Sequence, residues 1–183
     1  MRLRPQQTRY VATKIGIDLS NASFINMPKG KDVVVEATKN IIDENLAKER
    51  ALDDKVKKIL DENYDEIEFQ HIDERQLFFM IKKKMADSHG VIMNYDDRYN
   101  DLSHLILDEL YENYLIEYEL NENKVKNVIF KAFKAFADAY EEIDDIVYNK
   151  IRGMEKEVVF GSQDYELLYE KFYQEELLKR GML

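Results

Sequence analysis

His104 and two aspartates are the residues whose types and spacing come closest to a metal site. Asp101 lies three positions before His104, and Asp108 lies four positions after it. On a helix, these spacings place one imidazole and two carboxylates on a single face, where they could bind a cation such as zinc or iron. The alternative is that Asp101 caps the helix while His104 and Asp108 face water. We adopt the alternative and predict no metal ion or other cofactor.

Glu68 and His71 form a second pair of residues whose types and spacing could bind a metal. Glu-x-x-His pairs bind di-iron centres when two copies lie on facing helices. Here the pair falls in a stretch that we predict to be a non-helical joint, and the corresponding positions of the second half are Val159 and Ser162. The sequence also contains no glycine-rich phosphate loop and no Gly-x-Ser-x-Gly elbow. We therefore predict no catalytic residue, and a metal-dependent enzyme using His104 is the least favoured hypothesis.

Eight basic residues are candidates for a binding surface, provided that the fold gathers them on one face. They are Arg2, Arg4, Arg9, Lys14, Arg75, Lys82, Lys83 and Lys84. Such a patch would suit a nucleic acid or the ribosome. However, the net charge of −10, from 37 acidic and 27 basic residues, opposes general binding to phosphate backbones. A solvated helix face is the preferred interpretation of the three consecutive lysines.

Composition favours a cytoplasmic helical protein. Hydrophobic residues make up 45% of the 183 positions and charged residues 35%, while six glycines and two prolines leave little room for long loops. The absence of cysteine excludes disulfides and thiolate metal sites, and it fits a reducing compartment. The basic N-terminal residues lead into no apolar segment typical of a signal peptide. No apolar run approaches the roughly 18 residues that span a bilayer.

The clearest helix boundaries lie in the stretch from Asp73 to Gly90. Asp73 with Gln76 resembles a capping box, which satisfies free amide groups at a helix start. Gly90 supplies the left-handed residue that ends many helices. A stretch with the same plan runs from Asp164 to Gly181, 91 positions further on.

The remaining periodicity predicts a chain of helices with short interruptions. The residues from Asp32 to Leu60 form either one long helix or a helical hairpin, and we expect a bend near residues 50–54. The other expected elements are a helix at 5–21, an extended segment at 24–27, a polar connector at 94–100, a helix at 102–110, a strand-like segment at 115–120, a turn at 121–123, one or two helices at 125–151 and a last helix from about 164.

An offset of 91 positions aligns the two halves of the chain without gaps. The aligned pairs include core positions and helix ends: Ile15 with Ile106, Leu19 with Leu110, Val34 with Val125, Leu77 with Leu168 and Gly90 with Gly181. Chance similarity between amphipathic helices is the competing explanation. We predict an all-α fold of two pseudo-symmetric helical halves, residues 1–93 and 94–183, from a tandem duplication. The halves either share one domain or form two touching lobes, with at most a small strand pair from 24–27 and 115–120.

Long collinear stretches of the chain resemble a bacterial family, domain of unknown function 507. They are MRLRPQQTRYVATKIGIDLSNASFI, ALDDKVKKILDENYDEIEF, DERQLFFMIKKKMADSHGVIMNYDDRY, KNVIFKAF and EELLKRGM. The likeness covers nearly the entire chain. It implies a small, wholly helical bacterial protein, and it implies no catalytic or cofactor-binding residues because the family has no assigned activity.

The preferred functional hypothesis is a non-enzymatic interaction or scaffold protein. It follows from the acidic charged surface, the repeated helical unit and the absence of a convergent catalytic set. The expected partner is another protein, bound in a groove between the halves or along an exposed strip of aromatic side chains. The alternative is a nucleic-acid-associated or ribosome-associated factor that uses the basic residues, and no membrane partner is expected.

Overall fold

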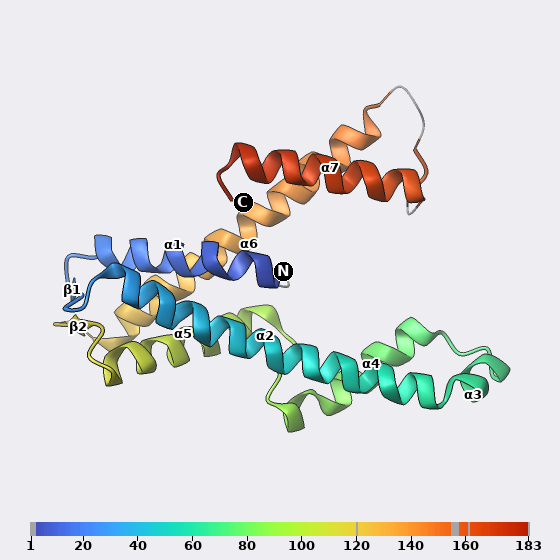
Figure 1. Ribbon diagram of the computed structural model, residues 1–183, viewed down its shortest axis with the longest axis horizontal. Coiled ribbons are helices and arrows are strands. Elements are labelled where there is room, and N and C mark those ends of the chain that lie inside the picture. The colour runs from blue at the N-terminus through green and yellow to red at the C-terminus, as the bar shows by residue number, and fades with distance from the viewer. Residues whose placement is uncertain (1–2, 120, 155–157, 161, 183) are drawn as a thin grey trace.

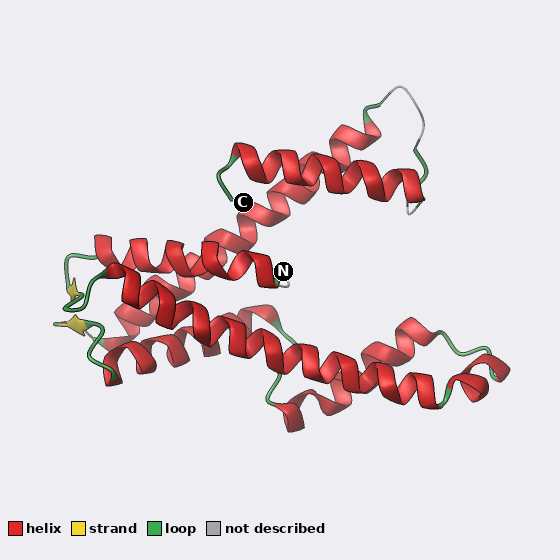
Figure 2. Ribbon diagram, in the orientation of Figure 1, coloured by secondary structure: helices red, strands yellow, loops and turns green. Residues whose placement is uncertain are grey.

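The computed structural model describes residues 3–119, 121–154, 158–160 and 162–182 (Figure 1). Figure 2 shows that helices dominate this part of the chain, with one pair of very short strands. The elements in order are η1 (Pro5–Gln7), α1 (Thr8–Asn21), β1 (Ile25–Asn26), α2 (Lys31–Glu62), α3 (Tyr64–Phe69), α4 (Glu74–Ala86), η2 (Asp87–His89), α5 (Tyr95–Glu112), β2 (Glu117–Tyr118), α6 (Glu122–Arg152) and α7 (Gln163–Lys179). The all-α class is therefore confirmed.

The two long helices, α2 and α6, start at the same end of the molecule and diverge into two arms (Figure 1). At the shared end, α1 packs against both α2 and α6, and α5 does the same. Beyond this core, α4 packs back along α2, and α7 packs back along α6. We call residues 52–91 the first arm and residues 143–182 the second arm. None of the helices in the described residues has the length and apolar content that crossing a membrane requires.

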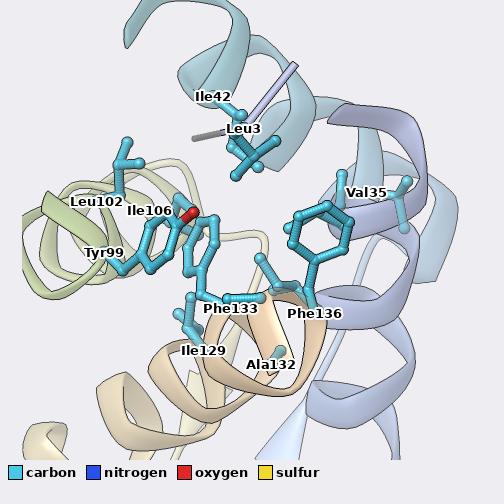
Figure 3. Close-up of a cluster of buried hydrophobic side chains, with 14 of the residues drawn as sticks. Leu3, Val35, Ile42, Tyr99, Leu102, Ile106, Ile129, Ala132, Phe133 and Phe136 are labelled. Carbon is cyan, nitrogen blue, oxygen red and sulfur yellow. The ribbon is translucent and has the colours of Figure 1, made fainter. Parts of the chain in front are cut away.

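The central core takes side chains from both halves of the sequence. Ile15 and Ile106 are fully buried in it, together with Val34 and Val125. The rings of Tyr99 and Phe133 stack with centroids 5.0 Å apart and planes 6° apart, as Figure 3 shows. The described residues of both halves of the sequence thus contribute to one shared core, which also reaches α7. A smaller apolar cluster lies in the first arm: Leu52, Val56, Leu60, Ile67, Ala86 and Val91.

The helix α2 is continuous, so the bend expected near residues 50–54 is wrong. Its 32 residues contain no glycine or proline, the residues that interrupt helices most readily. Its buried stripe also continues through Leu46, Leu52 and Val56 without a change of face. In the second half, α6 is likewise one helix of 31 residues.

The polar connector expected at residues 94–100 is also wrong, because these residues begin α5. The side chain of Asn94 caps this helix by accepting hydrogen bonds from the backbone amides of Asp96 and Asp97, at 2.9 and 3.1 Å. The two aspartates lie in the first turn, where the helix dipole favours negative charge. Asp101 therefore lies inside the helix and does not cap it.

The strand pair expected from residues 24–27 and 115–120 is confirmed in a shorter form. In the antiparallel pair of β1 and β2, Ile25 is opposite Tyr118 and Asn26 is opposite Glu117. The side-chain amide of Asn26 also donates a hydrogen bond, from Nδ2 to Glu117 Oε2 at 3.2 Å. This pair closes the end of the molecule from which both arms diverge (Figure 1).

The helix ends at Gly90 and Gly181 have the same local structure. Both glycines adopt the left-handed conformation, with φ of 63° and 64°, and each amide bonds to the carbonyl three residues earlier at 3.1 Å. The helix starts differ. Asp73 caps α4 by accepting from the amide of Gln76 at 3.0 Å, as predicted. However, Ser162 caps α7, so that Asp164 lies in its first turn.

Substitution of Gly16 by alanine tests the close approach of α1 and α2. A Cβ atom at this position would lie 2.5 Å from Cγ2 of Val35, a buried side chain that has little rotamer freedom in a helix. Overpacking costs about 1–3 kcal/mol, which exceeds the gain of about 1 kcal/mol from alanine's helix propensity. We expect Gly16→Ala to lower the free energy of unfolding, measured by urea denaturation. In a Val35→Ala background the same change should be neutral or stabilising; equal costs in both backgrounds would contradict the contact.

Candidate functional site

The three candidate residues for a metal site do not come together with further ligands. His104, Asp101 and Asp108 lie along α5, where His104 is half-buried and Asp108 is exposed. Within the described part of the chain, no group of three or more histidine, aspartate or glutamate side chains is close enough to hold a metal ion. Glu68 lies in α3, so the joint there is partly helical, whereas His71 follows in a turn with φ of 53°.

The basic candidates are dispersed, and several are engaged by carboxylates. Arg2 lies outside the described residues. Of the seven described, Arg9 bonds to Glu36 at 3.0 Å, Lys14 bonds to Asp18 at 2.5 Å, and Lys82 is buried. The other four lie apart from one another. Arg4 lies 5.8 Å from the ring centroid of Tyr173, and Arg75 borders a groove on the first arm. Lys83 and Lys84 are exposed on α4.

Lys82 belongs to a buried set of four charged side chains that joins α2, α4 and α5. We call Glu49, Asp53, Lys82 and Arg98 the ion cluster; each is at most 8% exposed. Lys82 Nζ lies 2.8 Å from Glu49 Oε1 and 2.7 Å from Asp53 Oδ1. Arg98 Nη1 donates to Glu49 Oε2 at 2.6 Å, while its Nε donates to Asn45 Oδ1, also at 2.6 Å. The cluster lies where the first arm leaves the core.

The ion cluster holds charged groups that balance one another. Burial by itself raises the pKa of Glu49, but hydrogen bonds and attraction from Lys82 and Arg98 lower it by more, so that its pKa lies below the ordinary 4.5. Glu49 is therefore ionised at neutral pH. Removal of one partner from a buried pair leaves an uncompensated charge, which costs several kcal/mol. The arrangement accordingly positions α4 and α5 on α2.

Tyrosines occupy the corresponding place in the second arm. At the offset of 91, Tyr140 corresponds to Glu49 and Tyr173 to Lys82. Their ring centroids lie 6.3 Å apart, and Tyr169 stacks on Tyr173 at 5.6 Å. The hydroxyl of Tyr169 donates a hydrogen bond to Asp144, the counterpart of Asp53. The buried contacts at the bases of the two arms thus differ, with ions in the first and aromatic rings in the second. The ion pairs described between α6 and α7, Lys150 with Glu175 and Arg180 with Glu142, are not buried.

A cavity lies between the arms, beside the ion cluster and the stacked tyrosines. It has a volume of about 420 Å³, and its lining includes Glu49, Asp144 and Tyr173. Glu49 is occupied by the ion cluster. Burial raises the pKa of Tyr140 to about 12 and also raises the pKa values of Tyr169 and Tyr173. These phenols therefore remain protonated at neutral pH and are poor bases or nucleophiles.

Sequence reasoning missed the ion cluster, although helical spacing contained a signal for it. Lys82 lies four positions after Phe78 and four before Ala86, and therefore within the apolar stripe of α4. Glu49 lies between Leu46 and Val56 in the buried stripe of α2. A charged residue in a buried stripe requires a partner. The partner could not be identified from one helix alone, because it comes from another element.

Large apolar side chains are exposed at the ends of both arms. At the end of the first arm, Phe69 is 84% exposed and Tyr64 is 54% exposed. At the end of the second arm, Phe160 is 75% exposed and Val159 is 71% exposed. We call residues 61–74 the first tip and the described residues 152–154, 158–160 and 162–165 the second tip. Grouped exposure of large apolar residues marks surfaces that bind other molecules.

The fold and these surfaces define an all-α protein with two helical arms on one core and apolar side chains at the tips. Residues 1–182 match the model of the family described as Protein of unknown function (DUF507). The chain belongs to this family, which confirms the resemblance found in its sequence. Its description names no activity. A comparison with curated proteins finds no match.

Neutralising substitutions in the ion cluster should strongly destabilise the protein. Glu49→Gln leaves Lys82 and Arg98 buried with less negative charge, and we expect a loss of about 3–5 kcal/mol in the free energy of unfolding. The matched control is Glu36→Gln, which removes the exposed partner of Arg9 and should cost less than about 1 kcal/mol. Urea denaturation at pH 7 measures both. Equal effects of the two substitutions would contradict the role of the cluster.

The contribution of Glu49 to stability should depend on pH in a defined direction. Because its pKa is lowered in the folded protein, this contribution is fully present above the ordinary value of 4.5. It is lost as the pH falls through the lower pKa of the folded state. The difference in unfolding free energy between the wild type and Glu49→Gln should therefore shrink between pH 5 and pH 3. A difference that stays constant in denaturation curves over this range would refute the prediction.

Proposed function

We propose that this protein is a non-enzymatic scaffold that binds other proteins through the tips of its two arms. The observation that carries the proposal is the exposure of Phe69 and Phe160, 84% and 75%, at the ends of the diverging arms (Figure 1). Exposed apolar surface gains about 25 cal/mol per Å² when a partner covers it. Aromatic residues are also enriched where proteins bind one another. We place this function in the cytoplasm, in keeping with the cysteine-free sequence.

We further infer that the two halves, residues 1–93 and 94–183, arose by tandem duplication. The order of elements supports it: α1, β1, α2 and α4 correspond to α5, β2, α6 and α7. The matching glycines, Gly90 and Gly181, and their equal hydrogen bonds support it too. At the same offset of 91 positions, Phe69 corresponds to Phe160. A duplicated unit would provide two related binding ends, and two linked sites raise the overall affinity for a partner that reaches both.

Nucleic-acid or ribosome binding is the alternative from the sequence, and the described residues favour it less. Lys82 is buried in the ion cluster, while Arg9 and Lys14 are paired with carboxylates. Phosphate binding gains affinity with the number of available cations. These pairings therefore reduce the number of candidate basic side chains that could contact phosphate. Titration with RNA and DNA at low and high salt discriminates between the two functions.

Removal of both exposed phenylalanines should weaken partner capture. The full chain and its Phe69→Ser, Phe160→Ser double variant are used as bait in extracts of cells that produce the protein, and quantitative mass spectrometry compares the captured proteins. We expect at least one stoichiometric partner to fall about tenfold or more, which corresponds to about 1.4 kcal/mol. A Leu105→Ser control changes an exposed apolar residue away from the tips and should retain the partner. Identical capture by the wild type and the double variant would refute the proposal.

A further inference from the structure

The first tip combines exposed apolar side chains with charge of a single sign. Half of its fourteen residues are acidic and none is lysine or arginine: Asp61, Glu62, Asp65, Glu66, Glu68, Asp73 and Glu74. All seven acidic residues are exposed, as are Tyr64, Phe69 and Ile72. Like charges at this density repel one another, so an unoccupied tip carries an electrostatic cost that a basic partner would relieve.

The local structure holds this apolar surface outward. Ile67 is buried in the small apolar cluster of the first arm and anchors α3 there. Phe69 follows two residues later on a different side of the short helix and is 84% exposed. The chain then turns at His71, which has φ of 53°, before Asp73 caps α4. The exposed phenylalanine thus projects from a folded and anchored segment.

A groove on the first arm continues from the tip. Its volume is about 500 Å³, and its lining is Lys57, Leu60, Asp61, Glu74, Arg75, Phe78 and Phe79. Asp61 and Glu74 belong both to this lining and to the acidic tip. Phe79 is 52% exposed, so the groove offers an aromatic wall. The charged residues of its lining are two acidic and two basic ones, and the excess of negative charge lies on the adjoining tip. Its size lies within the range of about 300–1,000 Å³ that is usual for binding pockets.

We infer that the first tip and its groove bind a basic amphipathic helix of a partner protein. Apolar side chains of that helix would pack against Phe69, Phe78 and Phe79, as an amphipathic helix does when it binds in a hydrophobic groove. The lysines and arginines of the partner helix would face the acidic residues of the first tip. This charge complementarity would set the orientation of the bound helix and its association rate. The inference rests on the proposed scaffold function and specifies the class of partner.

Charge argues against the other occupants. A nucleic acid or an anionic membrane would bring further negative charge to the tip. A second copy docked tip to tip would place the same seven acidic residues opposite one another. The second tip differs, because its described residues include one acidic and one basic residue, Asp164 and Arg152. It presents a similarly exposed phenylalanine, Phe160, without an excess of negative charge among its described residues, and therefore provides a matched control.

The test measures fluorescence anisotropy of labelled peptides with the full chain. The basic probe is a designed helix of about 18 residues, or five turns, with leucine and phenylalanine on one face and lysine and arginine on the other. The comparison probe has the same apolar face and glutamate in place of the basic residues. We expect the basic probe to bind at least about tenfold more tightly and to weaken as salt rises, because salt screens exposed charges.

Variants assign the binding to the first tip. Phe69→Ser and the charge reversal Glu66→Lys, Glu68→Lys should each weaken binding of the basic probe about tenfold, whereas Phe160→Ser should leave it unchanged. Thermal unfolding of each variant shows that it retains the fold. Equal binding of both probes, or equal weakening by Phe69→Ser and Phe160→Ser, would overturn the inference.

Failure of this inference can be separated from failure of the scaffold function. If neither probe binds but partner capture still depends on Phe69 and Phe160, the tips bind proteins and the partner class inferred for the first tip is wrong. If capture does not depend on the tips, the scaffold function itself is refuted.

Discussion

The length of α2 and α6 is the constraint on which the rest of the structure depends. Each helix has just over 30 residues, or nearly 50 Å at 1.5 Å per residue, and the shared core with α1 and α5 covers only the first part. Helices in water derive most of their stability from burying an apolar face. The second part of each helix therefore needs its own cover, which α4 and α7 supply. The two arms are the consequence of this need.

The arms meet the same requirement with different interactions. The first arm uses Glu49, Lys82 and Arg98, and the second uses stacked tyrosines. Buried ions contribute modest net stability, and their removal one at a time is costly. Aromatic pairs contribute through area and ring contacts. Because the pKa of Glu49 is lowered in the folded protein, the attachment of the first arm to the core weakens as the pH falls below the ordinary value of this group.

Much of the fold could be predicted from local chemistry. The cap at Asp73, the left-handed Gly90 and the small strand pair each depend on neighbouring residues, and the structure contains all three. The connector at residues 94–100 was predicted incorrectly because asparagine and aspartate favour turns and helix starts alike. The bend in α2 was predicted incorrectly because periodicity alone cannot distinguish one long helix from two short ones.

The sequence by itself determined the helical class, most helix ends and the family. These features follow from capping, periodicity and residue patterns within short stretches of chain. Only the tertiary structure decided that Lys82 is buried and that Phe69 and Phe160 are exposed. Hydrophobicity alone would predict an exposed lysine and two buried phenylalanines. Burial depends on which elements meet in space, and here α2, α4 and α5 enclose a lysine, whereas the ends of the arms have no further helix to cover a phenylalanine within the described residues.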